Sequence, residues 1–582
     1  MEAIIEKRIK EWTSSPFDRE TIDEIASLVK AGDNRELEDR FYRELEFGTG
    51  GLRGVLGAGT NRMNLYTVGM ATQGLANYIN AHAGEKGSIV IARDSRRNSD
   101  LFAREAASIL AGNGIMVYFF EDIAPTPFAS FAVRELGATA AIVVTASHNP
   151  PEYNGYKVYW DDGGQIVPPH DRNIIKEVGL ITSVSQIVKR DFDRGLNEGR
   201  IEYVDEKIYR AYIRNLEKAA LRPVTASKIS IAYTPLHGTG YKIIPETLRH
   251  FGFANLHVEP AQSVPDGAFP TVKSPNPEEK DALAMALELA ARVNADIVMA
   301  TDPDADRMGI AFRDASGACT LINGNQIGTM LLTYKLMRSR DLGKLPEGAA
   351  VIKTIVTTEL QQVIARDFGC SIDDVLTGFK WIASKMKERE TSGGAPFLFG
   401  GEESYGYLPV DFVRDKDAVS SCYFFAEMTD WLMAQGKTLQ QFLDEIYATY
   451  GLFLEDLHSI TMKGREGSEK IRAIMAGLRK TPPAAIAGLK VVSVNDILGL
   501  ERISPETGER AQITGLPSSD VLQFFLADGS KISLRPSGTE PKIKLYFSVQ
   551  EKTGGDAAAA KEKAREKISL LKASLLELVS SQ

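Results

Sequence analysis

Hydrophobic and polar positions along most of the chain follow two alternating periods. Short apolar runs, such as 88–94 (SIVIARD) and 138–146 (ATAAIVVTA), have the length and the β-branched residues of buried strands. Between them lie segments such as 99–114 (SDLFAREAASILAGNG), in which apolar residues recur every three or four positions, as on one face of a helix. Strands that alternate with helices in this way predict β-α-β units on a mostly parallel sheet.

The same rhythm restarts twice further along the chain and then changes. New strand-loop-helix series begin at 228–240 (KISIAYTPLHGTG) and at 349–358 (AAVIKTIVTT). From about Phe453, short strands lead to a long amphipathic helix over 557–579. These patterns predict an α/β protein with three related mixed-sheet domains and a C-terminal α+β domain. The predicted domains are 1–205, which includes an N-terminal helical extension, 206–320, 321–452 and 453–582.

Composition narrows the class of protein. The 582 residues are 43% hydrophobic and 25% charged, which is ordinary for a globular protein, and the net charge of −9 argues against broad nucleic-acid binding. The three cysteines are far apart and predict neither a disulfide framework nor a zinc site. The charged N-terminus lacks a secretory signal, and no apolar run approaches the ~18 residues of a membrane span. We therefore expect a soluble cytoplasmic protein that does not bind membranes.

The first segment with candidate chemistry is 145–157 (TASHNPPEYNGYK). Ser147 leaves the end of an apolar strand, and a nucleophilic serine requires exposure and a nearby base. His148 adjoins it, and Lys157 can return to it across an Asn154-Gly155 turn. The alternative is an ordinary Ser-His-Asn-Pro turn. The segment lacks the G-x-S-x-G of a hydrolase nucleophile elbow.

The second segment is 302–307 (DPDADR), which follows another apolar strand. In an extended loop its spacing places Asp302, Asp304 and Asp306 on one side, where unpaired carboxylates raise one another's pKa. Mg²⁺ prefers such oxygen ligands, so the segment predicts a metal site. An EF-hand is excluded because Arg307 stands where glycine is required and Arg313 where glutamate is required. The alternative is a solvated acidic turn.

Two further loops suit the recognition of a phosphorylated sugar. The glutamates of 400–407 (GGEESYGY) can accept hydrogen bonds from vicinal hydroxyls, although an exposed hairpin explains the same residues. The segment 535–544 (RPSGTEPKIK) offers a guanidinium fork, hydroxyls and backbone N–H groups for a phosphate, with a plain Pro-Ser-Gly turn as the alternative. Ligand loops of α/β sheets lie beyond the carboxyl ends of strands, so these loops are predicted to converge on one cleft.

Together, TASHNP, DPDADR and RPSGTEP, in this order, resemble the α-D-phosphohexomutase superfamily. FGTGGLRG, PLHGTG, TGFKWI, GEESYGY and RDKDAV are most similar to the bacterial phosphoglucomutase branch, which also contains the animal phosphopentomutase-type enzymes. The resemblance implies a heart-shaped fold of four domains with a central cleft. Its domains would carry, in order, the active-site serine, the metal loop, the sugar loop and a phosphate-binding loop.

The resemblance also implies roles for individual residues. Ser147 matches the phosphoserine, whose phosphate joins Asp302, Asp304 and Asp306 as a magnesium ligand. The general acid or base is left open among basic positions around the reacting group, which are Arg53, His148, Lys157 and Lys416. The positions implied in substrate binding are Arg307, Thr377, Gly378, Glu402, Ser404, Arg535, Ser537, Gly538, Thr539 and Lys544.

The implied reaction interconverts α-D-glucose 1-phosphate and glucose 6-phosphate through a phosphoserine enzyme. It requires Mg²⁺ and glucose 1,6-bisphosphate as intermediate and activator, in a monomer or homodimer. The sugar loop lacks the GEMSGH form of the dual mannose/glucose mutases, which disfavours phosphomannomutase activity. Phosphopentomutase activity on ribose or deoxyribose 1-phosphate is an alternative. Two others are a haloacid-dehalogenase-type enzyme with Asp302 as nucleophile and a catalytically silent sugar-phosphate sensor.

Overall fold

The computed structural model describes residues 2–48, 50–224, 226–314, 317–462, 464–537, 542–554 and 556–580. The chain forms two compact units. The first unit comprises Met1–Gly324 and Phe379–Trp431, and the second comprises Asn325–Gly378 and Leu432–Gln582.

The N-terminal extension is helical, as its periodicity predicts. Its helices are α1 (Ala3–Trp12), α2 (Arg19–Ala31) and α3 (Asn34–Phe41). Asp18 and Asp33 cap α2 and α3 by accepting hydrogen bonds from backbone N–H groups of the first turn. Trp12 and Phe41 are buried in a small core of their own, so the extension packs as an ordered part of the first unit.

A six-stranded mixed sheet with the order β1-β5-β4-β2-β3-β6 holds the serine segment. β4-β2, β2-β3 and β3-β6 pair in parallel, whereas β5 runs antiparallel to both β1 and β4. Its strands are β1 (Gly51–Val55), β2 (Ser88–Arg93), β3 (Met116–Phe119), β4 (Ala140–Val144), β5 (Tyr153–Trp160) and β6 (Ile201–Tyr203).

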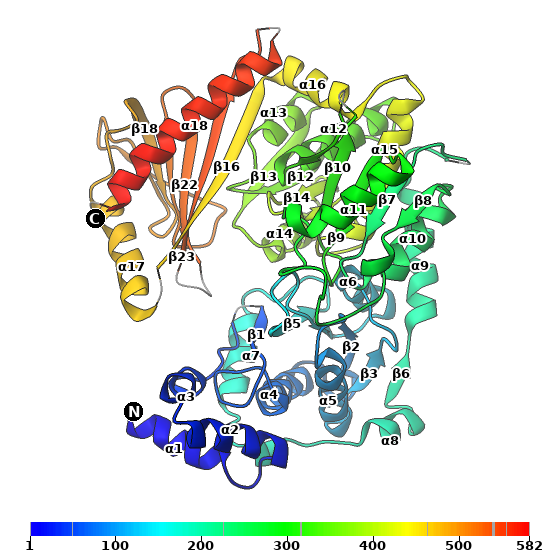
Figure 1. Cartoon of the computed structure of the whole chain (residues 1–582), viewed down its shortest axis with the longest axis vertical. Coiled ribbons are helices and arrows are strands. Elements are labelled where there is room, and N and C mark those ends of the chain that lie inside the picture. The colour runs from blue at the N-terminus through cyan, green and yellow to red at the C-terminus, as the bar shows by residue number, and fades with distance from the viewer. Residues whose placement is uncertain are drawn as a thin grey trace. The chain divides into compact units, whose positions relative to one another are not determined.

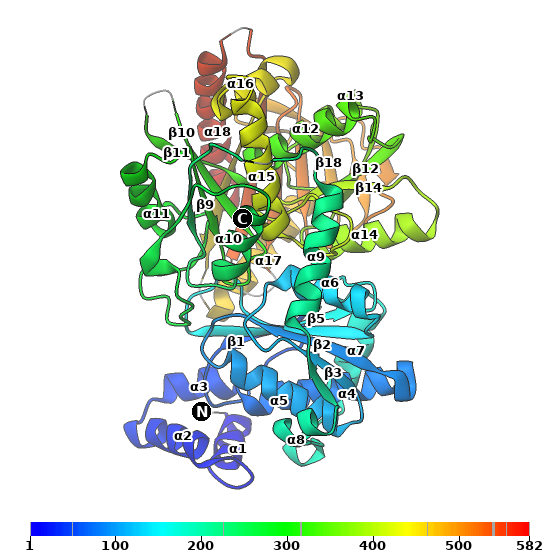
Figure 2. The ribbon, with the colours of Figure 1, turned by 90° about the vertical axis from the view of Figure 1, so that its right-hand side faces the viewer.

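Helices cover both faces of this sheet, which explains why β4 is apolar at every position (Figure 1). α4 packs against α5 and α7 on one face, and α6 packs against α9 on the other (Figure 2). The helical segments of this part are α4 (Leu65–Ala83), η1 (Gly84–Lys86), α5 (Ser99–Gly112), α6 (Thr126–Leu136), α7 (His170–Gly179), η2 (Val184–Gln186), α8 (Phe192–Asn197) and α9 (Asp205–Ala219).

The pairing of β1 with β5 corrects one detail of the sequence analysis. Asn154 and Gly155 were expected to form a turn, but both lie within β5, where Gly155 pairs with Arg53. β1 approaches β5 closely at Gly51, where φ is +129° and an added Cβ would lie 1.8 Å from the Tyr156 carbonyl oxygen. Only glycine fits there. As a result, Arg53 and Lys157 lie on adjacent strands beside the serine segment.

A five-stranded sheet with the order β11-β10-β9-β7-β8 holds the acidic segment between β9 and β10. β9, β7 and β8 pair in parallel, and β10 returns antiparallel to β9. The elements are β7 (Ile231–Thr234), α10 (Gly240–His250), β8 (Leu256–Val258), η3 (Pro260–Gln262), α11 (Lys280–Val293), β9 (Ile297–Thr301), β10 (Met308–Arg313) and β11 (Cys319–Ile322).

The rest of the first unit contains the sugar-loop candidate. β14 and β15 form a short antiparallel hairpin whose connection is 402–406. The Tyr407 hydroxyl donates to the Gly324 carbonyl at 2.8 Å and ties this hairpin to the unit. The elements are α14 (Phe379–Thr391), β14 (Phe397–Gly401), β15 (Tyr407–Leu408) and α15 (Ala418–Met433).

The second unit combines a parallel strand pair with a large antiparallel sheet. β12 and β13 pair in parallel beside α12, α13 and α16. These elements are α12 (Gly324–Asp341), β12 (Gly348–Thr354), α13 (Leu360–Asp367), β13 (Cys370–Val375) and α16 (Leu439–Tyr450).

The antiparallel sheet has the order β16-β23-β22-β21-β18-β19-β20, with β17 paired to β18. The predicted terminal helix is α18, whose buried residues recur every three or four positions and which packs on β16 and β23. The elements are β16 (Leu452–Thr461), α17 (Gly464–Lys480), β17 (Ala485–Ile486), β18 (Leu489–Asp496), β19 (Glu501–Ile503), β20 (Arg510–Gln512), β21 (Leu522–Leu526), β22 (Lys531–Pro536), β23 (Lys542–Glu551) and α18 (Ala557–Ser580).

Within the described ranges, no helix is both long enough and apolar enough to cross a bilayer.

Candidate active site

Ser147 lies directly beyond the carboxyl end of β4, in a left-handed backbone conformation with φ of +53°. Its hydroxyl donates a hydrogen bond to Asp302 Oδ2 at 2.7 Å and lies 3.3 Å from His148 Nδ1. The residue is only 4% exposed, so the exposed nucleophile that we expected is instead buried against the acidic segment. The two segments, 155 residues apart in sequence, therefore meet in one site.

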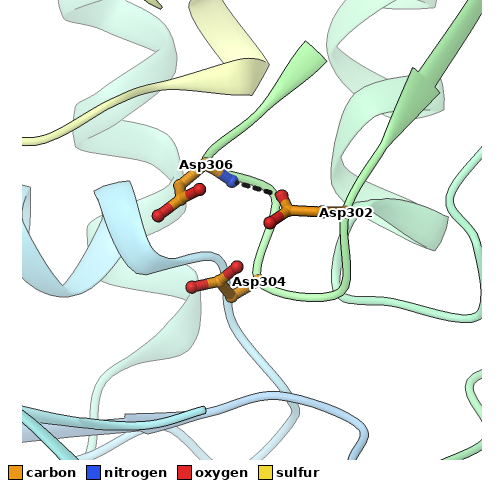
Figure 3. A group of neighbouring side chains, drawn as sticks. All are labelled: Asp302, Asp304 and Asp306. Carbon is orange, nitrogen blue, oxygen red and sulfur yellow. Dashed lines mark hydrogen bonds between the residues drawn. The ribbon is translucent and has the colours of Figure 1, made fainter. Parts of the chain in front are cut away.

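The acidic segment is a tight turn and not the extended loop that the spacing suggested. The Ala305 N–H donates to the Asp302 carbonyl at 2.9 Å, and Ala305 has φ of +49°. The turn nevertheless gathers the carboxylates of Asp302, Asp304 and Asp306, with one oxygen of each within 4.8 Å of the others (Figure 3). All three are buried, which excludes the alternative of a solvated acidic turn.

Two lysines supply positive charge to this cluster. Lys157 Nζ lies 2.7 Å from Asp304 Oδ2 and 3.2 Å from Asp306 Oδ2, while Lys416 Nζ lies 3.0 Å from Asp306 Oδ2. Burial alone would lower the pKa of Lys157 and of Lys416, but the neighbouring carboxylates outweigh it and raise both. Both lysines are therefore held as cations.

The carboxyl groups respond unequally to these surroundings. Burial, together with the charges of Asp304 and Asp306, raises the pKa of Asp302 well above its usual range. Burial also acts to raise the pKa of Asp304, but the ammonium of Lys157 outweighs it and lowers that pKa. Negative charge is thus concentrated on the lysine-paired carboxylates.

Two carboxylate oxygens of the cluster have no hydrogen-bond partner among the residues that the structure describes. Asp304 Oδ1 and Asp306 Oδ1 are buried without one, and the Asp306 oxygen lies 3.9 Å from Arg307 Nε. A buried acceptor without a partner costs about 1–3 kcal/mol, more when it is charged. A hard divalent cation would satisfy both oxygens, so the donor set of the cluster fits Mg²⁺.

Sequence analysis missed a neighbour that orients this cluster. Thr126, the first residue of α6, donates its hydroxyl to Asp304 Oδ2 at 2.8 Å and its N–H to the Asp304 carbonyl at 2.9 Å. The only sequence signal for this role is a threonine before proline at a helix start, which is typical of many helices that bind nothing.

Arg307 and His148 complete the surroundings of the serine. Arg307 Nη1 lies 2.5 Å from Glu278 Oε1, another contact that the sequence did not predict. Burial lowers the pKa of His148 well below its usual value, and the cations of Arg307 and Arg53 lower it further. The imidazole beside Ser147 is therefore neutral.

The sugar-loop candidate lies beside Lys416. Glu402, only 5% exposed, closes the β14–β15 hairpin by donating its N–H to the Gly406 carbonyl at 2.9 Å. Its carboxylate contributes to the raised pKa of both Arg307 and Lys416. Gly406 lets the Lys416 side chain pass, since an added Cβ would lie 2.0 Å from Lys416 Cδ. Ser404 is half-buried in the same loop.

The remaining substrate-binding candidates belong to the second unit. Thr377 and Gly378 follow β13, and Gly378 has φ of +115°. Arg535 on β22 stands directly opposite Lys544 on β23. Like charges at such a pair repel each other, and an anion between them would remove the repulsion. Ser537 donates its N–H to the Lys542 carbonyl at 2.8 Å, whereas Gly538 and Thr539 lie outside the described residues.

Nearly all of the segments described above lie within regions of the chain that match one known protein family. Residues 44–184, 209–317 and 323–450 match the alpha/beta/alpha domains I, II and III of phosphoglucomutase/phosphomannomutase, and 471–566 match its C-terminal domain. The chain belongs to the phosphoglucomutase/phosphomannomutase family. The predicted α/β fold class and the resemblance to the phosphohexomutases are thereby confirmed.

Among relatives of this family, the phosphoglucomutase of Staphylococcus aureus (strain MRSA252) is 39% identical over 518 residues, which cover 88% of this chain and 91% of the relative. That of Staphylococcus haemolyticus (strain JCSC1435) is 38% identical over 525 residues, covering 90% and 94%.

Solved structures of the phosphoglucomutase/phosphomannomutase family share the fold. One is pp63/parafusin, a phosphoglucomutase from Paramecium in an open form, with a TM-score of 0.66, 16% identity, and coverage of 93% of this chain and 95% of that chain. Another is a family protein from Burkholderia thailandensis, with a TM-score of 0.62, 18% identity, and coverage of 90% and 97%.

Proposed function

We propose that this chain interconverts α-D-glucose 1-phosphate and glucose 6-phosphate through a phosphorylated Ser147. The observation that carries this proposal is the 2.7 Å contact between the Ser147 hydroxyl and Asp302 inside a buried triad of carboxylates. A buried hydroxyl beside three carboxylates suits a site that holds a phosphoryl group and a cation together. The relatives named phosphoglucomutase support the choice of sugar.

The proposed reaction begins with the phosphoryl group on Ser147 Oγ. The bond from phosphorus to Oγ breaks as phosphorus bonds to the free hydroxyl oxygen of the sugar monophosphate, which yields a bound bisphosphate. The hydroxyl proton passes to a basic group beside the triad, for which the neutral imidazole of His148 is the candidate. Lys157 and Lys416, which are held as cations, are the candidates to donate the proton that the departing Oγ takes up. The other phosphate then returns to Ser147 by the reverse step.

Asp302, Asp304 and Asp306 would hold Mg²⁺ at this site. When bound, the ion neutralises charge on the transferred phosphoryl group, where most of the catalysis of phosphoryl transfer resides. Lys157 and Lys416 add fixed positive charge at the same carboxylates. We assign Arg307 to the reacting phosphate and Glu402 to the sugar hydroxyls.

The proposal is tested by turnover of purified full-length protein with Mg²⁺ and catalytic glucose 1,6-bisphosphate. Glucose 1-phosphate, mannose 1-phosphate and ribose 1-phosphate are compared by kcat/KM. We expect glucose 1-phosphate to exceed the other two by at least about tenfold, which corresponds to ~1.4 kcal/mol of transition-state discrimination. Preference for ribose 1-phosphate would establish the pentomutase alternative. Binding of all three without turnover would establish the sensor alternative.

We assign Arg535 and Lys544 to the binding of a substrate phosphate. Removing one charged hydrogen bond costs about 1.5–3 kcal/mol, so Arg535→Gln and Lys544→Gln should each raise the KM for glucose 1-phosphate by roughly 10- to 100-fold. Arg510→Gln, which removes an exposed charge on β20 of the same sheet, is the matched control and should leave KM unchanged. An unchanged KM in both Arg535→Gln and Lys544→Gln would contradict the assignment.

A further inference from the structure

A buried ion pair that the proposed reaction does not use contacts the serine segment. Asp94 and Arg96 follow β2, their side chains are fully buried, and Arg96 Nε lies 3.3 Å from Asp94 Oδ2. Burying two opposite charges is costly unless their remaining hydrogen-bonding groups are satisfied. The partners of the remaining hydrogen-bonding groups of Asp94 and Arg96 therefore indicate the role of the ion pair.

The guanidinium of Arg96 points at the backbone that carries the nucleophile. Its two terminal nitrogens donate to four carbonyl oxygens within seven residues of chain. These accepting carbonyls are those of Ser147, Asn149, Pro150 and Tyr153. A planar fork with several donors can hold four acceptors at fixed angles, which the single ammonium of a lysine cannot do.

Asp94 fixes the backbone N–H of Ser147 through Thr145. Its Oδ2 accepts from the Thr145 hydroxyl at 2.6 Å, and the Thr145 oxygen in turn accepts from the Ser147 N–H at 2.8 Å. The N–H of Ser147 is thus fixed through Asp94 and its carbonyl through Arg96. Ser147 occupies a left-handed conformation that a residue with a side chain seldom adopts, so it needs support of this kind.

The domain built on the five-stranded sheet also contacts Arg96 and the serine segment. The Arg96 guanidinium lies over the ring of the buried Phe269, 4.9 Å from its centre. Ser274, from the same segment, donates its hydroxyl to the His148 carbonyl at 2.8 Å. The segment that precedes α11 therefore contacts both the serine segment and Arg96.

We infer that Arg96, anchored by Asp94, is a positioning residue that holds the Ser147 backbone in the conformation that aims Oγ at Asp302. This inference rests on the proposed phosphoserine reaction. The arginine touches no reacting atom, so its loss should slow phosphoryl transfer and leave the binding of substrate nearly unchanged. A displacement of about 1 Å at a reacting group can cost roughly 10²-fold in rate.

The test compares Arg96→Lys with Arg93→Lys in the full-length protein with Mg²⁺. Arg93 is a matched control because it is also buried and donates to backbone carbonyls, but those of Phe120, Glu121 and Asp122. Three quantities are measured for each variant: kcat and KM for glucose 1-phosphate, and the single-turnover rate at which labelled phosphate passes from glucose 1,6-bisphosphate to the protein.

Arg96→Lys should lower kcat and the single-turnover rate about 10²-fold, with KM changed by less than about threefold. Arg93→Lys should leave all three near wild type once corrected for its folded fraction. Equal rates in the two variants would overturn the inference. If Arg96→Lys does not fold, Asp94→Asn keeps the size of the anchor and decides the question: wild-type kcat overturns the inference and a selective loss of kcat supports it.

The wild-type protein separates this inference from the proposal on which it rests. If wild-type protein takes up no label and interconverts no sugar phosphate, the proposed function is wrong. If it does both and Arg96→Lys matches the Arg93→Lys control, only the positioning role is wrong.

Discussion

Ser147→Ala should lower mutase turnover by at least about 10³-fold and abolish the transfer of labelled phosphate from glucose 1,6-bisphosphate to the protein. In the proposed reaction Ser147 Oγ carries the phosphoryl group, because it is the hydroxyl that contacts Asp302 from the end of β4, whereas the Thr126 hydroxyl donates to Asp304. Covalent catalysis that loses its nucleophile retains only the contributions of binding and electrostatics. Turnover is measured with glucose 1-phosphate.

The chemical stability of the label identifies the residue that carries it. A phosphoserine survives mild alkali and hydroxylamine, whereas an acyl phosphate on Asp302 would be released by both. Ser88→Ala, at the opposite end of the sheet on β2, is the control and should label and turn over normally. Hydroxylamine-labile label, or label that persists in Ser147→Ala, would instead support the dehalogenase-type alternative.

The sequence predicted that the serine and acidic segments meet, but it did not predict the local backbone geometry of either segment. Strand alternation and the order of the motifs were enough to place Ser147 and Asp302 at strand ends, and the structure brings the two side chains within hydrogen-bond distance. The spacing of the aspartates was interpreted as an extended loop, because alternate residues share one side only in extended backbone. In the structure a turn brings the three carboxylates together instead, and Ala305 has a left-handed backbone conformation in it. The spacing of the aspartates does not predict such a turn.

Other features could not be predicted because they depend on long-range packing. Asn154-Gly155 is a strong turn signal, yet these residues form part of β5 because β1, a hundred residues earlier, pairs with them. Arg307 was expected to face a phosphate, and its contact with Glu278 comes from a segment with no recognisable motif. Arg96 carries no local signal, because its acceptors are carbonyls more than fifty residues away.

Removal of the proposed Mg²⁺ is the second change for which we expect a large effect. We expect EDTA to abolish turnover and Mg²⁺ to restore it, and we expect Asp304→Asn to lower kcat by roughly 10²–10³-fold at saturating glucose 1-phosphate. An amide keeps the size of the side chain but offers one neutral oxygen in place of two anionic ones, and it removes the charge that faces Lys157 at 2.7 Å. The concentration of Mg²⁺ required for half-maximal rate should rise in the variant.

A readout independent of activity distinguishes a lost metal site from a damaged fold. Mg²⁺ bound to the native state raises Tm by mass action, so it should stabilise the wild-type protein and stabilise Asp304→Asn much less. The control is Asp296→Asn, which changes a carboxylate before β9, at the opposite end of the strand that leads to Asp302. The physical basis of this expectation is that, within the described part of the chain, the buried Asp304 Oδ1 and Asp306 Oδ1 accept no hydrogen bond. Turnover indifferent to EDTA, with no shift of Tm by Mg²⁺, would mean that Lys157 and Lys416 alone neutralise the cluster.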